Sequence, residues 1–117
     1  MGLDISFYIV PTKLNQEELN KIVNATGIGE DYKVQTFSGR GYVYILDTLR
    51  DDLKNRYKSF EDYVVLERED VEKLIVKNVE GIINDIHRYY INPLSLFTWM
   101  LEEIDFDKET IIRHVSS

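Results

Sequence analysis

The stretch EDVEKLIVKNVEGIINDIHRYY, residues 69–90, carries the longest helical periodicity in the chain. Gly81 interrupts it at a cost of about 1 kcal/mol relative to alanine, which indicates close packing at that point. A broad apolar stripe is typical of a helix that faces a core, so we expect one long helix over about residues 69–90. The side chains that form the stripe are Val71, Leu74, Ile75, Val79, Ile82, Ile83, Ile86 and Tyr90, with Val76 widening it.

Shorter helical segments lie on both sides of this stretch. We expect Asn92-Pro93 to end the long helix and Pro93 to lie in the first turn of a helix that reaches residue 104. Apolar residues also recur at helical spacing over residues 42–57, where Asp52 and Arg56 are expected to pair on the outer face.

A further helix is expected at about residues 15–26. Asn15 is a suitable N-cap, and Glu17 and Glu18 lie in the first turn, where the helix dipole favours carboxylates. Gly27 and Gly29 follow, as is common after the last turn of a helix.

Both ends of the chain are expected to be strands. Apolar residues alternate from Leu3 to Ile9, before Pro11 ends the pattern, and residues 110–115 alternate as well. Residues 32–37 and 63–66 are shorter extended stretches. The sequence therefore predicts a single α+β domain over residues 1–117. Its small sheet includes the N- and C-terminal strands and packs under three to four helices.

The charge of the chain is concentrated in its second half. The net charge of the 117 residues is −7, and residues 61–117 hold thirteen acidic and six basic residues. A negative protein repels phosphate backbones, which argues against nucleic acid as a direct partner and favours a protein with a basic surface. The chain has no cysteine, which excludes disulfides and thiolate catalysis.

No membrane segment is expected. No stretch approaches the roughly 20 apolar residues of a membrane-spanning helix. Leu3 to Val10 contains Asp4 and lacks a basic start, so it does not resemble a signal peptide. Gly2 and Ser6 match a myristoylation pattern, but a strand explains these residues better. We expect a cytoplasmic protein.

Catalytic signals are sparse, and the sequence argues against an enzyme. His87 lies two residues from Asp85 on the expected helix, so their side chains point in different directions. An alternative hypothesis places a small active site around His87, Tyr89, Tyr90 and His114, and it requires both imidazoles in one pocket. Residues 38–41 lack the Lys-Ser/Thr ending of a phosphate loop, and no cofactor is expected.

Acidic residues form two groups. The first, within residues 61–72, partly coincides with a helix start, where carboxylates are stabilised. The second has less structural reason, because acids at the end of a helix oppose its dipole. It lacks the glycine and distal glutamate of a calcium loop, so we expect a partner-binding role and no metal. Its members are Glu102, Glu103, Asp105, Asp107 and Glu109.

Exposed aromatic side chains are the other expected anchors for a partner. Tyrosine combines a large apolar area with a polar tip, which suits it to interfaces. Tyr44 falls off the apolar face of its expected helix and Tyr89 lies near the edge of its own. With Trp99, they are expected to be exposed and to contact a partner.

The opening segment Met1-Gly2-Leu3-Asp4-Ile5-Ser6-Phe7-Tyr8 resembles the start of small uncharacterised bacterial and phage proteins that begin Met-Gly-Leu-Asp. The end, Glu109-Thr110-Ile111-Ile112 followed by Ser116-Ser117, is similar to their serine-rich terminal strand. Those proteins often contain an aromatic-Arg-Lys-x-Asn segment that opens a helix, and this chain has Tyr42-Val43-Tyr44-Ile45-Leu46-Asp47 there instead. The resemblance implies no activity, and it favours a phage or mobile-element origin.

Three hypotheses follow from the sequence. The first is a small acidic interaction protein that binds a basic protein surface, for example as an inhibitor of a host defence or nucleic-acid-binding complex. In that role, carboxylates would take the place of phosphates. The second is the small enzyme with a histidine–tyrosine site. The third is a structural module that associates with itself through exposed aromatic side chains.

Overall fold

The computed structural model describes residues 2–57, 62–84 and 88–116. The chain forms two compact units. The sheet unit comprises Met1–Gly39, Glu61–Glu67 and Asp105–Ser117, and the helical unit comprises Arg40–Phe60 and Arg68–Ile104.

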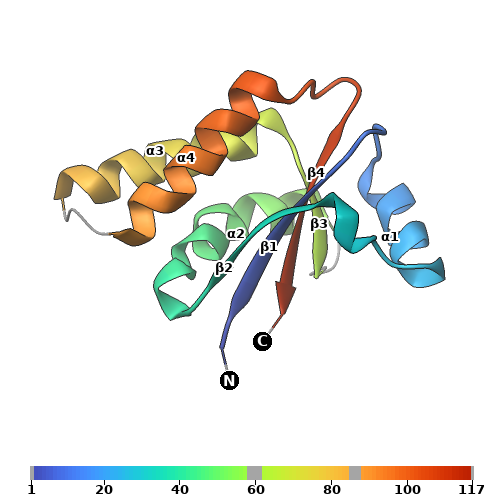
Figure 1. Cartoon of the computed structure of the whole chain (residues 1–117), viewed down its shortest axis with the longest axis horizontal. Helices are drawn as coiled ribbons and strands as arrows, with labels where there is room; N and C mark the ends of the chain where they lie inside the picture. The colour runs from blue at the N-terminus through green and yellow to red at the C-terminus, as the bar shows by residue number, and fades with distance from the viewer. Residues whose placement is uncertain (1, 58–61, 85–87, 117) are drawn as a thin grey trace. The chain divides into compact units, whose positions relative to one another are not determined.

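The sheet unit contains an antiparallel sheet with its strands in the order β2-β1-β4-β3 (Figure 1). The strands are β1 (Asp4–Val10), β2 (Lys33–Ser38), β3 (Tyr63–Leu66) and β4 (Thr110–Ser116). The N- and C-terminal strands are therefore the central pair, with Tyr8 opposite Ile112. This sheet, together with four α-helices among the described residues, confirms the predicted α+β class.

One row of side chains crosses all four strands on the same face of the sheet. Thr36 of β2 is opposite Ser6 of β1, Ser6 is opposite His114 of β4, and His114 is opposite Tyr63 of β3. Because side chains alternate between faces along each strand, these four point to one side. The strand order thus assembles hydroxyl, imidazole and phenol groups that lie far apart in the sequence.

Helix α1 (Gln16–Ala25) covers part of this face. Asn15 caps it as predicted: its side-chain oxygen accepts from the Glu18 N–H at 2.8 Å, and Glu18 accepts from the Asn15 N–H at 3.1 Å. A short 3₁₀ helix, η1 (Glu30–Tyr32), precedes β2. The buried apolar residues that join helix and sheet are Tyr8, Val10, Leu14, Leu19, Val65 and Ile112.

The helical unit contains η2 (Arg40–Tyr42), α2 (Tyr44–Arg56), α3 (Arg68–Asn84) and α4 (Arg88–Glu103). Helices α3 and α4 lie side by side and run in opposite directions (Figure 1). None of the helices in the described ranges has the length and hydropathy needed to cross a bilayer.

The predicted long helix ends earlier than expected. It begins near residue 69 as predicted, but α3 ends at Asn84, and residues 88–90 belong to α4. Gly81 explains why the two helices approach closely, because a Cβ at this position would lie 2.2 Å from the Tyr90 ring. The close packing predicted at Gly81 is confirmed, and the predicted first-turn position of Pro93 is wrong, since Pro93 lies inside α4.

The predicted ion pair between Asp52 and Arg56 is also wrong. Arg56 instead forms two hydrogen bonds to the Asp70 carboxylate, with N–O distances of 2.8 and 2.6 Å. Asp52 pairs with Lys73. Asp52 and Arg56 of α2 therefore each pair with a residue of α3 and not with each other. Charged side chains on one helix can find partners on the neighbouring helix, which the sequence of a single helix does not reveal.

Candidate functional site

The predicted acidic residues are divided between the two units. In the sheet unit, Asp105, Asp107 and Glu109 lie in the turn before β4. The Asp105 side chain accepts from the Asp107 N–H at 3.0 Å, and the Glu109 side chain accepts from the Asp105 N–H at 3.1 Å. Two of these three carboxylates, those of Asp105 and Glu109, thus stabilise the turn. This is a structural reason for acidic residues here that the sequence pattern did not reveal.

In the helical unit, Glu102 and Glu103 lie exposed in the last turn of α4. Acidic residues elsewhere form ion pairs, as Asp47 does with Arg50 at 2.6 Å. The ion pairs between described residues include none of the five predicted acids. Nor do the described ranges contain a group of three or more acidic or histidine side chains arranged to hold a metal.

The predicted exposure of Tyr44 is wrong, because Tyr44 is 8 % exposed. Its ring packs against Tyr90 at 4.7 Å between centroids, and its hydroxyl lies 2.9 Å from Asn78 Oδ1 and 2.5 Å from the Tyr89 carbonyl. Burial raises the pKa of Tyr44 well above its ordinary value, with smaller contributions from Tyr90 and Tyr42. The Tyr44 hydroxyl therefore forms its hydrogen bonds inside the helical unit. Helical periodicity alone does not predict these partners.

The other two predicted aromatic anchors, Tyr89 and Trp99, differ in their exposure. Tyr89 is half-buried and meets Tyr42 edge-on, with ring centroids 4.8 Å apart. Trp99 is 42 % exposed, as expected. A role for Trp99 in binding stays a prediction.

The histidine–tyrosine site of the enzyme hypothesis is not assembled within either unit. His87 lies outside the described residues. His114 belongs to the sheet unit, whereas Tyr89 and Tyr90 belong to the helical unit. The partner of His114 is Tyr63, which the sequence analysis missed: their rings stack at 4.0 Å with an interplanar angle of 11°. Only the pairing of β3 with β4 brings them together.

The surroundings of His114 favour its neutral form. Burial lowers the pKa of His114, Lys33 acts in the same direction, and Asp62 and Glu30 oppose this effect. The hydroxyl groups of Ser6 and Thr36 lie 2.8 Å apart. This bond directs the Ser6 hydroxyl toward β2, on the side of β1 away from His114. Ser6 and His114 therefore do not have the geometry of a nucleophile and its base.

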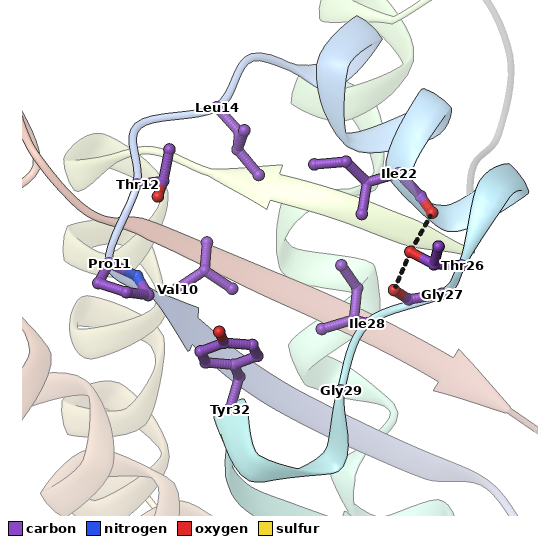
Figure 2. A pocket seen from close by; sticks show the side chains of 10 residues that line it. All are labelled: Val10, Pro11, Thr12, Leu14, Ile22, Thr26, Gly27, Ile28, Gly29 and Tyr32. Carbon is purple, nitrogen blue, oxygen red and sulfur yellow. Dashed lines mark hydrogen bonds between the residues drawn. The ribbon is translucent and has the colours of Figure 1, made fainter.

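An apolar hollow of about 310 Å³ lies beside α1 in the sheet unit (Figure 2). At one side of the hollow, the Thr26 hydroxyl lies 3.4 Å from the Ile22 carbonyl and 3.2 Å from the Gly27 carbonyl, to which it donates. Ile22 and Tyr32 are 36 and 44 % exposed. The lining offers mainly apolar contact and holds no carboxylate or imidazole; it consists of Val10, Pro11, Thr12, Leu14, Ile22, Thr26, Gly27, Ile28, Gly29 and Tyr32.

Helix α3 carries an exposed apolar stripe, formed by Val76, Val79 and Ile83. Their side chains are 57, 41 and 75 % exposed. Residues at i, i+3 and i+7 share one side of a helix, so the three are neighbours. Their periodicity predicted a core-facing position, which is wrong for this part of the stripe. The buried positions are Asp70, Val71, Leu74 and Asn78, two of them polar.

A second hollow, of about 360 Å³, adjoins this α3 stripe. Val76 is its apolar contact, and charged side chains surround it. The lining residues are Thr48, Glu72, Lys73, Val76, Lys77 and Glu80. The α3 stripe thus ends in a concave surface with a charged border, an arrangement that suits contact with another protein.

Comparisons of the chain with protein-family models, curated proteins and solved structures found no match.

Proposed function

We propose that the protein acts by binding another protein through the α3 stripe. The observation that carries this proposal is the exposure of three large aliphatic side chains on one side of one helix, with Ile83 three-quarters exposed. Apolar side chains that gather on a helix face are a common docking surface for a partner. Scattered single apolar residues would need no such explanation.

Charge indicates the kind of partner. Two glutamates, Glu72 and Glu80, and two lysines, Lys73 and Lys77, border the hollow beside the stripe, and Lys73 is paired with Asp52. The border of the hollow is therefore of mixed charge, and it is the net charge of the whole chain, −7, that favours a basic partner. We therefore propose a partner that presents apolar side chains surrounded by lysine or arginine, because opposite charges speed association and exclude partners of like charge.

The proposal extends to the exposed carboxylates Glu102 and Glu103. They add negative charge to the helical unit without a basic neighbour among the recorded ion pairs. A basic surface of this kind is typical of proteins that bind nucleic acid. Inhibition of such a protein, for example a host defence complex met by a phage-encoded binder, is the specific role that we propose.

The test is capture with matched variants. The full chain is expressed with an affinity tag in cells of its source, as wild type, as Val76→Ser/Ile83→Ser and as Val43→Ser/Ile91→Ser. Val43 and Ile91 are 40 and 43 % exposed on the same unit, so the second variant is the control. We expect the wild type and the control to retain the same partner and the stripe variant to lose it.

The captured protein is then purified and its affinity measured. Loss of two buried aliphatic contacts is expected to weaken binding by about tenfold or more. Equal affinity of the stripe variant and the wild type would refute the role of α3. Capture of only a second copy of the chain would replace partner binding by self-association.

A further inference from the structure

The sheet unit has a third hollow, of about 290 Å³, whose lining is mainly polar. It lies where α1 meets the start of β3. Helix α1 contributes Asn20, Val23 and Asn24, and the other side consists of Asp62 and Tyr63. The hollow therefore offers two amides, one carboxylate and one phenol around a single aliphatic side chain.

Asn20 is held in a defined orientation by Gln16, a residue that is 9 % exposed. The Gln16 side chain accepts from the Val65 N–H at 2.9 Å and donates to the Tyr63 carbonyl at 2.8 Å. It also donates to Asn20 Oδ1 at 2.9 Å. Since Oδ1 faces Gln16, the NH₂ group of Asn20 is the end left to act as a donor elsewhere.

Tyr63 is also held by groups outside the hollow. His114 stacks on its ring at 4.0 Å, and the Tyr8 ring lies tilted at 6.5 Å between centroids. A side chain fixed by a second layer of contacts loses less conformational entropy when it binds a ligand. Two polar side chains of the hollow, Asn20 and Tyr63, are thus held in place, whereas Asn24 and Asp62 are exposed at its border.

The hollow contains one carboxylate, that of Asp62. The nearby charges of Glu30 and Lys33 offset each other in an ion pair of 2.8 Å. The ion pairs recorded for the described part of the chain do not include Asp62. Asp62 supplies an acceptor for two hydroxyl groups, while Asn20 and Asn24 supply donors.

We propose that this hollow binds one ring of a sugar. Each sugar hydroxyl both donates and accepts hydrogen bonds, and a carboxylate next to amide NH₂ groups satisfies both functions at once. Val23 and the Tyr63 ring provide apolar contact for the C–H groups of a sugar ring. An anion is disfavoured by Asp62, and a purely cationic ligand would make no use of the amide donors of Asn20 and Asn24. The proposal is independent of the α3 stripe.

The test is an NMR titration of the isotope-labelled full chain with D-glucose, D-galactose and D-mannose. At least one sugar is expected to shift the amide signals of Asn20, Asn24 and Tyr63 with saturation. Asp62→Asn is expected to weaken that binding by about tenfold or more, because it removes the charged acceptor. Its side chain is exposed and its main-chain bond to Val115 is kept, so folding is retained.

Glu17→Gln is the control, since Glu17 is an exposed carboxylate of α1 that does not line the hollow. Its affinity should equal that of the wild type. Tetrahydropyran-2-methanol, which has the ring without adjacent hydroxyl groups, should not bind. Absence of saturable shifts with all three sugars would overturn the proposal. Equal binding by Asp62→Asn, or equal shifts with arginine methyl ester, would also overturn it.

Discussion

Pro93 removes a hydrogen bond from the middle of α4, and Tyr44 replaces it. A proline has no N–H to donate to the carbonyl four residues earlier, which here is Tyr89. The Tyr44 hydroxyl lies 2.5 Å from that carbonyl and satisfies it. Asn78 takes part in the same cluster, because its NH₂ group donates to the Leu74 carbonyl and leaves its oxygen facing Tyr44.

This arrangement predicts a coupling between two substitutions. Tyr44→Phe should lower the free energy of unfolding by about 1–3 kcal/mol, because it removes a hydrogen bond to a partly buried carbonyl. In a Pro93→Ala background the restored N–H can donate to Tyr89, so the loss should be smaller. Urea unfolding of the four proteins measures the difference, and Tyr32→Phe, with an exposed ring, is the control. Equal losses in both backgrounds would contradict the explanation.

His114 predicts a pH dependence. Its pKa lies below the ordinary value of 6.5, chiefly because of burial, so the unfolded chain binds a proton more readily than the folded one. His114 therefore stabilises the fold above pH 6.5, and this contribution is lost as the pH falls through the folded-state pKa. NMR titration should give a midpoint below 6.5, lower still in Asp62→Asn and higher in Lys33→Gln. A midpoint at or above 6.5 would contradict this account.

At the scale of the elements, charged residues of α2 stabilise the helical unit by pairing with residues of α3. Asp70 is 1 % exposed, and the two hydrogen bonds from Arg56 compensate its buried charge. The same contact raises the pKa of Arg56, mainly through the hydrogen bond to Asp70. A pair of this kind is worth more than an exposed one, because removing the arginine leaves a carboxylate in a poorly hydrated place.

Arg56→Ala should therefore destabilise the protein. Water reaches the guanidinium, so we expect a loss of about 2 kcal/mol, below the 3–5 kcal/mol typical of fully buried pairs. Lys21→Ala is the matched control: Lys21 lies 3.9 Å from Glu17, and both side chains are more than three-quarters exposed. Chemical unfolding should show no measurable change for the control. Similar losses in both variants would show that burial of Asp70 is not the cause.

The elements themselves were largely predictable, because their signals are local. The Asn15 cap located the start of α1, and alternation located β1 and β4. The break between α3 and α4 was not predictable from periodicity, because Tyr89 and Tyr90 continue the pattern of residues 69–84. The described contact between the two helices is tertiary, since Gly81 leaves space for the Tyr90 ring.

The candidate sites were less predictable than the elements. Asn20 and Asn24 are four residues apart on α1, a spacing that indicates a shared helix face. Their position next to Tyr63 depends on Gln16, which contacts β3 across 47 residues of sequence. The row Thr36–Ser6–His114–Tyr63 likewise depends on strand pairing, and single-sequence patterns do not specify the partner of a strand.

At the scale of the whole molecule, negative charge opposes the tendency of the exposed apolar side chains to associate. The net charge of −7 produces repulsion between copies at neutral pH. Repulsion vanishes near the isoelectric point, about 4.8, where carboxylates become protonated. Aliphatic side chains such as Val76 and Ile83 are then exposed on a chain that has no net charge to keep copies apart.

We therefore predict that the protein is monomeric in sedimentation at pH 7.5 and low salt and self-associates near pH 4.8. Val76→Ser/Ile83→Ser should associate less at that pH, whereas Val43→Ser/Ile91→Ser, with the same loss of aliphatic groups elsewhere, should behave more like the wild type. The reason is that contiguous apolar area drives association more strongly than the same area dispersed. If both variants associate as the wild type does, the α3 stripe is not the surface that charge repulsion keeps apart. If the wild type is already a dimer at pH 7.5, self-association through exposed side chains becomes the better description of this chain.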